Sequence, residues 1–269
     1  MKTTLLYLLC FVVCCDAAYC AADANTTPAK GWDSFTASLD KDGPTLQDRV
    51  LQGSKETFFR TDNFTALLLA GGASVVMHNE PSNQSFDNKV ASHFERHGNL
   101  PSDLDEATTT VGGPGFHFAV TGLWYGLASA DKDDLNRQRA WTMMTALSIT
   151  GITTLGLKAA VNNEQPNQKH GMAWPSGHTA SSFTVASVLD EFYGPQIGIP
   201  AYAAAGFVGY RMMDAGDHWA SDVLFGGVLG WVVGHTVAGK HKQLEVAGFE
   251  VTPYFSESGA NGIALVRQF

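Results

Sequence analysis

Two histidines and an aspartate have the types and spacing needed to move protons or to attack an electrophile. His218 and Asp222 are four residues apart, so on a helix they share a face and the carboxylate can reach one imidazole nitrogen. That pairing fixes the tautomer and leaves the other nitrogen free as a nucleophile or base. A protonated His178 could give its proton to a leaving oxygen. The alternatives are a surface His–Asp pair and an incidental histidine.

The residues just before His178 are typical of an anion site. Ser176 is a natural helix N-cap, and Gly177 permits close approach to the backbone. The free N–H groups of a helix that begins here would point at any anion in front of it. A capped helix start without a ligand is the alternative interpretation.

Two cations flank this segment in the sequence. Lys158 lies near the end of an apolar stretch, and Pro166 disfavours helical geometry at Gln165, so the helix should end before that residue. Arg211 supplies a planar fork of N–H donors that suits phosphate oxygens. Alone, Lys158 could be an ordinary lysine favoured by the helix dipole, and Arg211 could be unrelated to the histidines.

Together the three clusters contain the groups needed for in-line displacement at phosphorus. Here the chain resembles the type 2 phosphatidic acid phosphatase (PAP2) and vanadium haloperoxidase superfamily. The signature of that superfamily is K-x6-R-P, then P-S-G-H, then S-R-x5-H-x3-D. The three motifs occur in this order, and the resemblance covers about Ala140 to Gly239.

The resemblance implies a phosphatase that hydrolyses phosphomonoesters or pyrophosphates, with phosphorylated small molecules and lipid phosphates as candidate substrates. His218 would attack phosphorus to form a phosphohistidine, Asp222 would orient it, and His178 would protonate the leaving group. No metal or other cofactor would be required for hydrolysis. The phosphate oxygens would be held by Lys158, Gln165, Ser176, Gly177 and Arg211.

Three positions depart from the signature. Gln165 stands where the family has arginine, so a charge-assisted hydrogen bond becomes a neutral one and weaker phosphate affinity is expected. Six residues rather than five separate Arg211 from His218, and Gly216 could absorb the extra one. Tyr210 replaces the usual serine.

Two other functions stay open on these residues. A vanadium-dependent haloperoxidase would hold vanadate in the same pocket with His218 as the metal ligand, although Gln165 weakens the cationic cradle. A catalytically impaired pseudo-phosphatase would bind phosphate or serve only as a structural bundle. Asp214 and Asp217 add negative charge near the pocket, so we expect both to face outward.

The elements that must position these residues are helices. Apolar stretches predict an all-α bundle of about six helices, as the family fold implies. Residues 25–62 are polar and aperiodic, which indicates a linker or loosely packed segment before a helical phosphatase domain at 63–242. Residues 243–269 predict a C-terminal β-hairpin packed on the bundle. The six stretches are 64–77, 117–128, 140–160, 181–192, 201–213 and 221–238.

The N-terminus has the layout of a signal peptide at residues 1–24. Lys2 precedes the apolar run 5–13, small residues follow, and all four cysteines lie within the first 20 residues. The run is shorter than the ~20 residues of a spanning helix. We expect cleavage before Asn25 and export to a periplasmic or extracytoplasmic location.

The amino-acid composition limits the kinds of partner that the protein can bind. The 269 residues are 45% hydrophobic and 16% charged, which excludes general disorder, and a net charge of -9 disfavours nucleic acid. The charge-free run 141–157 is rich in threonine, so a soluble bundle or one with peripheral membrane contact is expected. The other histidines lack metal-ligand spacing, so we assign no metal. The sequence carries no signal for an oligomeric state.

Overall fold

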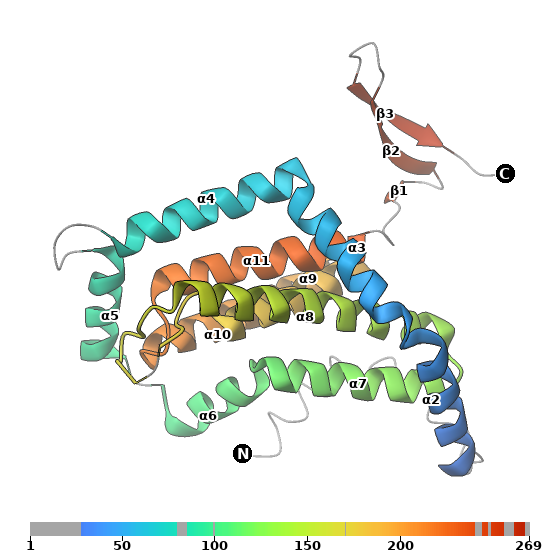
Figure 1. Ribbon diagram of the computed structural model, residues 1–269, viewed down its shortest axis with the longest axis horizontal. Coiled ribbons are helices and arrows are strands. Elements are labelled where there is room, and N and C mark those ends of the chain that lie inside the picture. Colours follow the sequence, from blue (N-terminus) through green and yellow to red (C-terminus); the bar gives the residue numbers. More distant parts are fainter. Residues whose placement is uncertain are drawn as a thin grey trace.

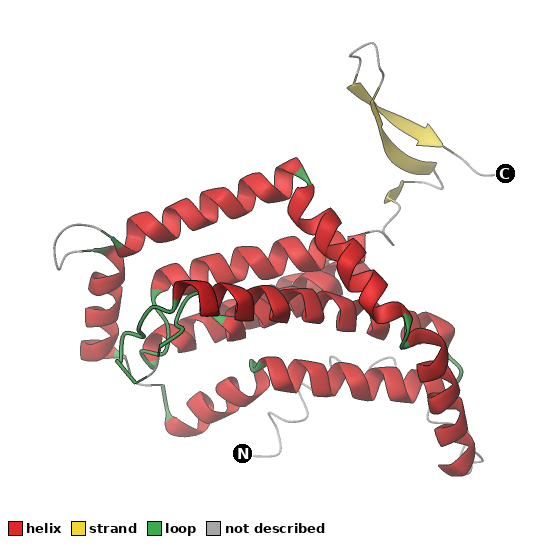
Figure 2. Ribbon diagram, viewed as in Figure 1, coloured by secondary structure: helices red, strands yellow, loops and turns green. Residues whose placement is uncertain are grey.

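The computed structural model describes residues 28–79, 85–98, 100–169, 171–239, 244–246, 249–255 and 261–266. The signal peptide expected at 1–24 lies outside these ranges. Within them, ten helices precede three short strands (Figures 1 and 2). The helices are α2 (Pro28–Asp42), α3 (Thr45–Phe59), α4 (Thr61–His78), α5 (Phe86–His97), α6 (Ser102–Val111), α7 (Pro114–Ala130), α8 (Asp134–Val161), α9 (Gly177–Tyr193), α10 (Pro195–Asp214) and α11 (Ala220–Ala238).

The expected all-α architecture is present, but the expected number of helices is wrong. The six apolar stretches are α4 and α7 to α11, and α2, α3, α5 and α6 are additional. Helices α2 and α3 occupy most of the segment 25–62 that was expected to be a linker. These four helices are polar and bury few residues, so a search for apolar runs passes over them.

The core lies between α8, α9 and α11, with α4 packed on its outside (Figure 1). Helices α9 and α11 approach closely because α11 presents glycines to α9. A Cβ at Gly230 would lie 2.2 Å from the backbone oxygen of Ala180, and one at Gly226 would lie 2.7 Å from that of Ser176. This packing brings the N-terminal ends of α9 and α11 together.

Helix α5 stands across that end of the bundle and contacts both α10 and α11 (Figure 1). Ser85 caps it by accepting a hydrogen bond from the backbone N–H of Asn88 at 3.2 Å. The loop that joins α8 to α9 lies at the same end. The helix starts and the loop therefore enclose one region.

The C-terminal strands are β1 (Leu244–Val246), β2 (Phe249–Phe255) and β3 (Asn261–Val266). They form an antiparallel sheet in the order β1-β2-β3, where the sequence indicates a two-stranded hairpin. The expectation that this region packs on the bundle is wrong, since Figure 1 shows the sheet apart from the helices. It contributes nothing to the site described next.

Candidate active site

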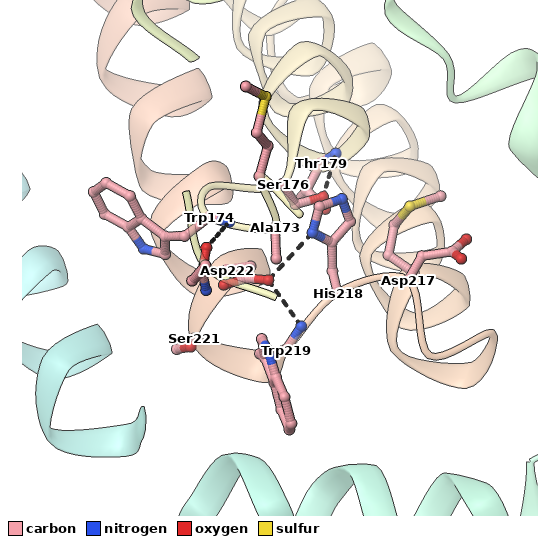
Figure 3. A network of polar contacts seen from close by, with 12 residues as sticks. Ala173, Trp174, Ser176, Thr179, Asp217, His218, Trp219, Ser221 and Asp222 are labelled. Atoms are coloured by element: carbon pink, nitrogen blue, oxygen red, sulfur yellow. Dashed lines mark hydrogen bonds and ion pairs between the residues drawn. The ribbon is translucent and has the colours of Figure 1, made fainter. Parts of the chain in front are cut away.

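His218 and Asp222 make the contact that their spacing predicts. Nδ1 of His218 lies 3.2 Å from Oδ2 of Asp222, which also accepts the backbone N–H of Trp219 at 3.0 Å (Figure 3). His218 is 6% exposed and Asp222 is fully buried. His218 lies just before α11 and not within it, so the aspartate both caps the helix and orients the imidazole. Nε2 is left as the ring nitrogen able to react.

Ser176 caps α9 as predicted. Its Oγ accepts hydrogen bonds from the backbone N–H of Thr179 at 3.4 Å and from Oγ1 of the same residue at 3.0 Å (Figure 3). The backbone N–H of Ser176 donates to the backbone oxygen of Asp222 at 3.1 Å. This bond ties the predicted anion site at the start of α9 directly to the segment that carries His218.

Lys158 lies in the last turn of α8 and reaches the same region. A Cβ at Gly177 would meet the Cε of Lys158 at 4.0 Å, so the lysine stem lies beside the α9 N-terminus. Its Nζ donates to the backbone oxygens of Met172 at 2.5 Å and Ala173 at 2.9 Å. The lysine therefore also holds the loop before α9, a role that its sequence position did not suggest.

Arg211 is fixed by two carboxylates. Its Nε and Nη2 donate to Asp105 of α6, and its Nη1 donates to Asp217 at 2.5 Å. The expectation that Asp217 faces outward is therefore wrong, although its carboxylate is turned away from His218 (Figure 3). Asp214 accepts the backbone N–H of Leu100 at 3.1 Å, which directs it toward the segment between α5 and α6.

Gln165 lies in a loop that is tied to the histidine segment. The backbone oxygen of its neighbour Glu164 accepts a hydrogen bond from Nε1 of Trp219 at 2.8 Å. Oε1 of Gln165 is buried and has no hydrogen-bond partner within the described part of the chain. The segment that carries Lys158 and Gln165 is thus connected to the segment that carries His218, through Trp219.

His178 lies among charged groups. Burial lowers its pKa to about 4, and the positive charges of His218 and Arg211 act in the same direction, with a smaller effect from Lys158. The Asp217 carboxylate opposes the shift. At neutral pH the free protein therefore holds His178 as the neutral imidazole.

His117 of α7 is a neighbour of His178 that sequence reasoning missed. Burial and the charge of His178 lower its pKa to about 4. Its Nδ1 is buried and unpartnered within the described residues. It stands alone in an apolar stretch with no motif around it, so no sequence signal could have identified it.

Among the described residues, no group of three or more His, Cys, Asp or Glu side chains could hold a metal ion. The arrangement contains a nucleophile, an orienting carboxylate, a second histidine, two cations and a helix N-terminus. It can bind an anion and transfer a group to a nitrogen.

The chain is similar in sequence to a known protein family and to a curated relative. Residues 139–244 match the family model of the PAP2 superfamily. The chain is 31% identical over 106 residues to the lipid A 1-phosphatase of Porphyromonas gingivalis, a match that covers 36% of this chain. The matched region spans 24% of that relative, or about a quarter of its length.

Two solved structures are similar in fold. A transmembrane PAP2 type phosphatidylglycerolphosphate phosphatase from Bacillus subtilis superposes with a TM-score of 0.56 at 18% identity, covering 71% of this chain and 98% of that one. LpxE from Aquifex aeolicus gives a TM-score of 0.49 at 20% identity, with coverages of 59% and 98%. The Bacillus structure supports the helical fold derived above.

Proposed function

Because this chain carries a PAP2-superfamily domain, we propose that it is a lipid phosphatase that works through a covalent phosphohistidine on His218. The observation that carries the proposal is the buried pair of His218 and Asp222 beside the N-terminus of α9. The pairing leaves Nε2 of His218 free to attack phosphorus, and the helix start supplies N–H donors for the phosphate oxygens.

The reaction proceeds in two displacements. In the first, a bond forms between Nε2 of His218 and phosphorus, the bond to the ester oxygen breaks, and His178 gives that oxygen a proton. In the second, a water molecule loses a proton to the now neutral His178 and attacks phosphorus. The P–N bond breaks, and inorganic phosphate and free His218 are released.

The protonation of His178 depends on the substrate. Its pKa of about 4 in the free protein means that the acid form is scarce at pH 7. A bound phosphate places negative charge among the same residues, and this charge raises the pKa of His178. The proton donor is therefore formed mainly when substrate is present.

Lipid phosphates are the proposed substrate class because the helices of the bundle expose large apolar side chains. Helices α8 and α11 are long and apolar enough to cross a membrane; 67% of the apolar stretch of α11 is buried in the core, whereas only 33% of that of α8 is buried. Exposed apolar side chains include Leu68 and Leu69 on α4, and Leu155 on α8. Surface of this kind favours contact with a lipid phase. We propose that the protein is exported and associated with a membrane.

A catalytically impaired phosphate-binding protein is the second candidate. Arg211 already donates to Asp105 and Asp217, and Gln165 contributes no charge. Both features lower the positive charge available to a phosphate.

The test measures phosphate release by the full chain in detergent, from a short-chain phosphatidate and a soluble aryl phosphate. We expect release that His218→Ala abolishes, faster turnover of the lipid, and a phosphohistidine at His218 detectable by mass spectrometry after alkaline quench. His93→Ala, which alters an exposed histidine on α5, is the matched control. A folded protein that binds phosphate without releasing it from either ester would establish the impaired alternative.

A further inference from the structure

A second buried carboxylate lies directly behind the histidine segment. Asp87, in the first turn of α5, is 1% exposed. Its Oδ1 accepts the backbone N–H of Ser221 at 2.9 Å, and its Oδ2 accepts the Ser221 hydroxyl at 2.5 Å. Ser221 lies in the first turn of α11, where backbone N–H groups have no partner within the helix. Asp87 therefore caps α11 from another helix.

The backbone N–H, the hydroxyl and the backbone oxygen of Ser221 each make a hydrogen bond. Besides the two bonds to Asp87, its backbone oxygen accepts the hydroxyl of Ser74 on α4 at 2.9 Å. Both serines and Asp87 are buried, so water does not replace these contacts at low cost. The residue next in the chain is Asp222, the partner of His218 (Figure 3). A shift of Ser221 would therefore move the carboxylate that orients the imidazole.

His78 adds a second connection to the same turn. Its Nδ1 lies 3.0 Å from Oδ2 of Asp87, and its ring meets the Trp219 ring edge-to-face, with centroids 5.4 Å apart. Trp219 immediately follows His218, and its backbone N–H donates to Asp222. The capping bond runs from the Trp219 N–H to Asp222. His78 of α4 contacts Trp219, and Asp87 of α5 contacts Ser221, so both helices touch the turn that this bond closes.

We propose that Asp87 is a positioning residue for the phosphoryl-transfer reaction, acting through Ser221 on the His218–Asp222 pair. This inference rests on the proposed function for its kinetic consequence. It assigns part of the active-site geometry to α4 and α5, which precede the matched segment 139–244. Asp87 touches no reacting atom. Its effect is to keep the α11 N-terminus where Nε2 of His218 can attack in line.

Substitution of Asp87 should lower kcat and leave KM nearly unchanged. Lys158 and Arg211 do not hydrogen-bond to Asp87, and the start of α9 is linked to it only indirectly, through the bond from the Ser176 N–H to the Asp222 backbone oxygen, so we expect a small effect on ground-state binding. A displacement of the nucleophile by about 1 Å costs on the order of a hundredfold in rate. We expect Asp87→Ala to lower kcat by about that factor and Asp87→Asn by roughly tenfold, each with KM within twofold of the unmodified protein.

The matched control is a buried carboxylate at the opposite end of the bundle. Helix α2 lies at the other end of the bundle from α5 (Figure 1). Asp42 of α2 accepts a hydrogen bond from the Tyr125 hydroxyl at 2.9 Å and pairs with Arg137. Asp42→Asn should lower thermal stability and leave kcat unchanged. Ser221→Ala removes the hydroxyl contact alone, and it tests the same connection if Asp87→Ala fails to fold.

A readout without turnover separates this inference from the proposed function. The ¹⁵N-histidine NMR spectrum reports the tautomer of His218, assigned by its loss in His218→Ala. We expect Asp87→Asn to change that signal and Asp42→Asn to leave it. If the parent chain is active and Asp87→Asn leaves both kcat and the His218 signal unchanged, the positioning role is overturned. An equal loss of kcat in Asp42→Asn also overturns it. An inactive parent with an altered signal overturns the function and retains the positioning role.

Discussion

Asp105 accepts two parallel hydrogen bonds from the guanidinium of Arg211, which lies 106 positions later in the chain. Nε of the arginine donates to Oδ1 at 2.6 Å, and Nη2 donates to Oδ2 at 3.3 Å. This two-pronged geometry is the one that a phosphate would take with the same guanidinium. In the free protein, a carboxylate from α6 thus occupies donors that the superfamily resemblance assigns to phosphate.

Asp105→Asn should strengthen phosphate binding, because it removes a competing negative charge from Arg211. A charge-assisted hydrogen bond contributes about 1 kcal/mol more than a neutral one, so we expect the inhibition constant of inorganic phosphate to fall roughly fivefold. Asp103→Asn, which alters an exposed carboxylate on the same helix, is the control. Weaker binding in Asp105→Asn would instead show that Asp105 is required to hold the guanidinium in place.

Gln165→Arg should also tighten phosphate binding. It places a cation in the loop that Trp219 holds beside the histidine segment, and the gain should again be about fivefold in the inhibition constant of phosphate. Gln168→Arg adds the same charge at an exposed position of the same loop and should change little. Equal gains from the two variants would mean that only the overall charge of the loop matters.

Acid should destabilise the protein between about pH 6.5 and pH 4. Burial lowers the pKa of His117 and of His178 from 6.5 to about 4, so the unfolded chain binds more protons than the folded one in that window. Unfolding therefore becomes easier as pH falls through it. The melting temperature should drop from pH 7 to pH 4.5, and His117→Gln should reduce the drop. If the melting temperature of His117→Gln drops as much as that of the unmodified protein, the lowered pKa of His117 does not cause the acid sensitivity. His93→Gln serves as the control.

Gly230→Ala should separate α9 from α11. The added methyl group would lie 2.2 Å from the backbone oxygen of Ala180 and 2.8 Å from the backbone nitrogen of Thr184, and backbone atoms cannot rotate away. We expect a loss of about 1–3 kcal/mol in unfolding free energy, measured by thermal denaturation. Gly227→Ala, whose methyl meets the Phe183 ring at 3.5 Å, is the neighbouring control. Equal stability of the two variants would contradict this account of the packing.

The sequence by itself determined the local features of this protein. Six helices follow from apolar stretches of helical length. The cap formed by Ser176 follows from its residue type, because a serine hydroxyl can accept a hydrogen bond from a backbone N–H three residues later. The contact of His218 with Asp222 joins residues four positions apart, as predicted, although His218 lies just before α11 and not on the same helix. Each depends on residues within a few positions of one another, so it can be predicted from the sequence without knowledge of the tertiary contacts.

Only the tertiary structure decided which groups meet across the bundle. Asp105 lies on Arg211 and Asp87 lies on Ser221, yet α5 and α6 are polar helices without a motif. Their side chains become significant because a buried cation or helix N-terminus requires a partner, and the fold supplies one from a distant segment. The close packing of α9 on α11 that joins the two halves of the site has the same origin. Sequence spacing carries no information about such partners, because the distance between them is set by packing and not by the number of residues that separate them.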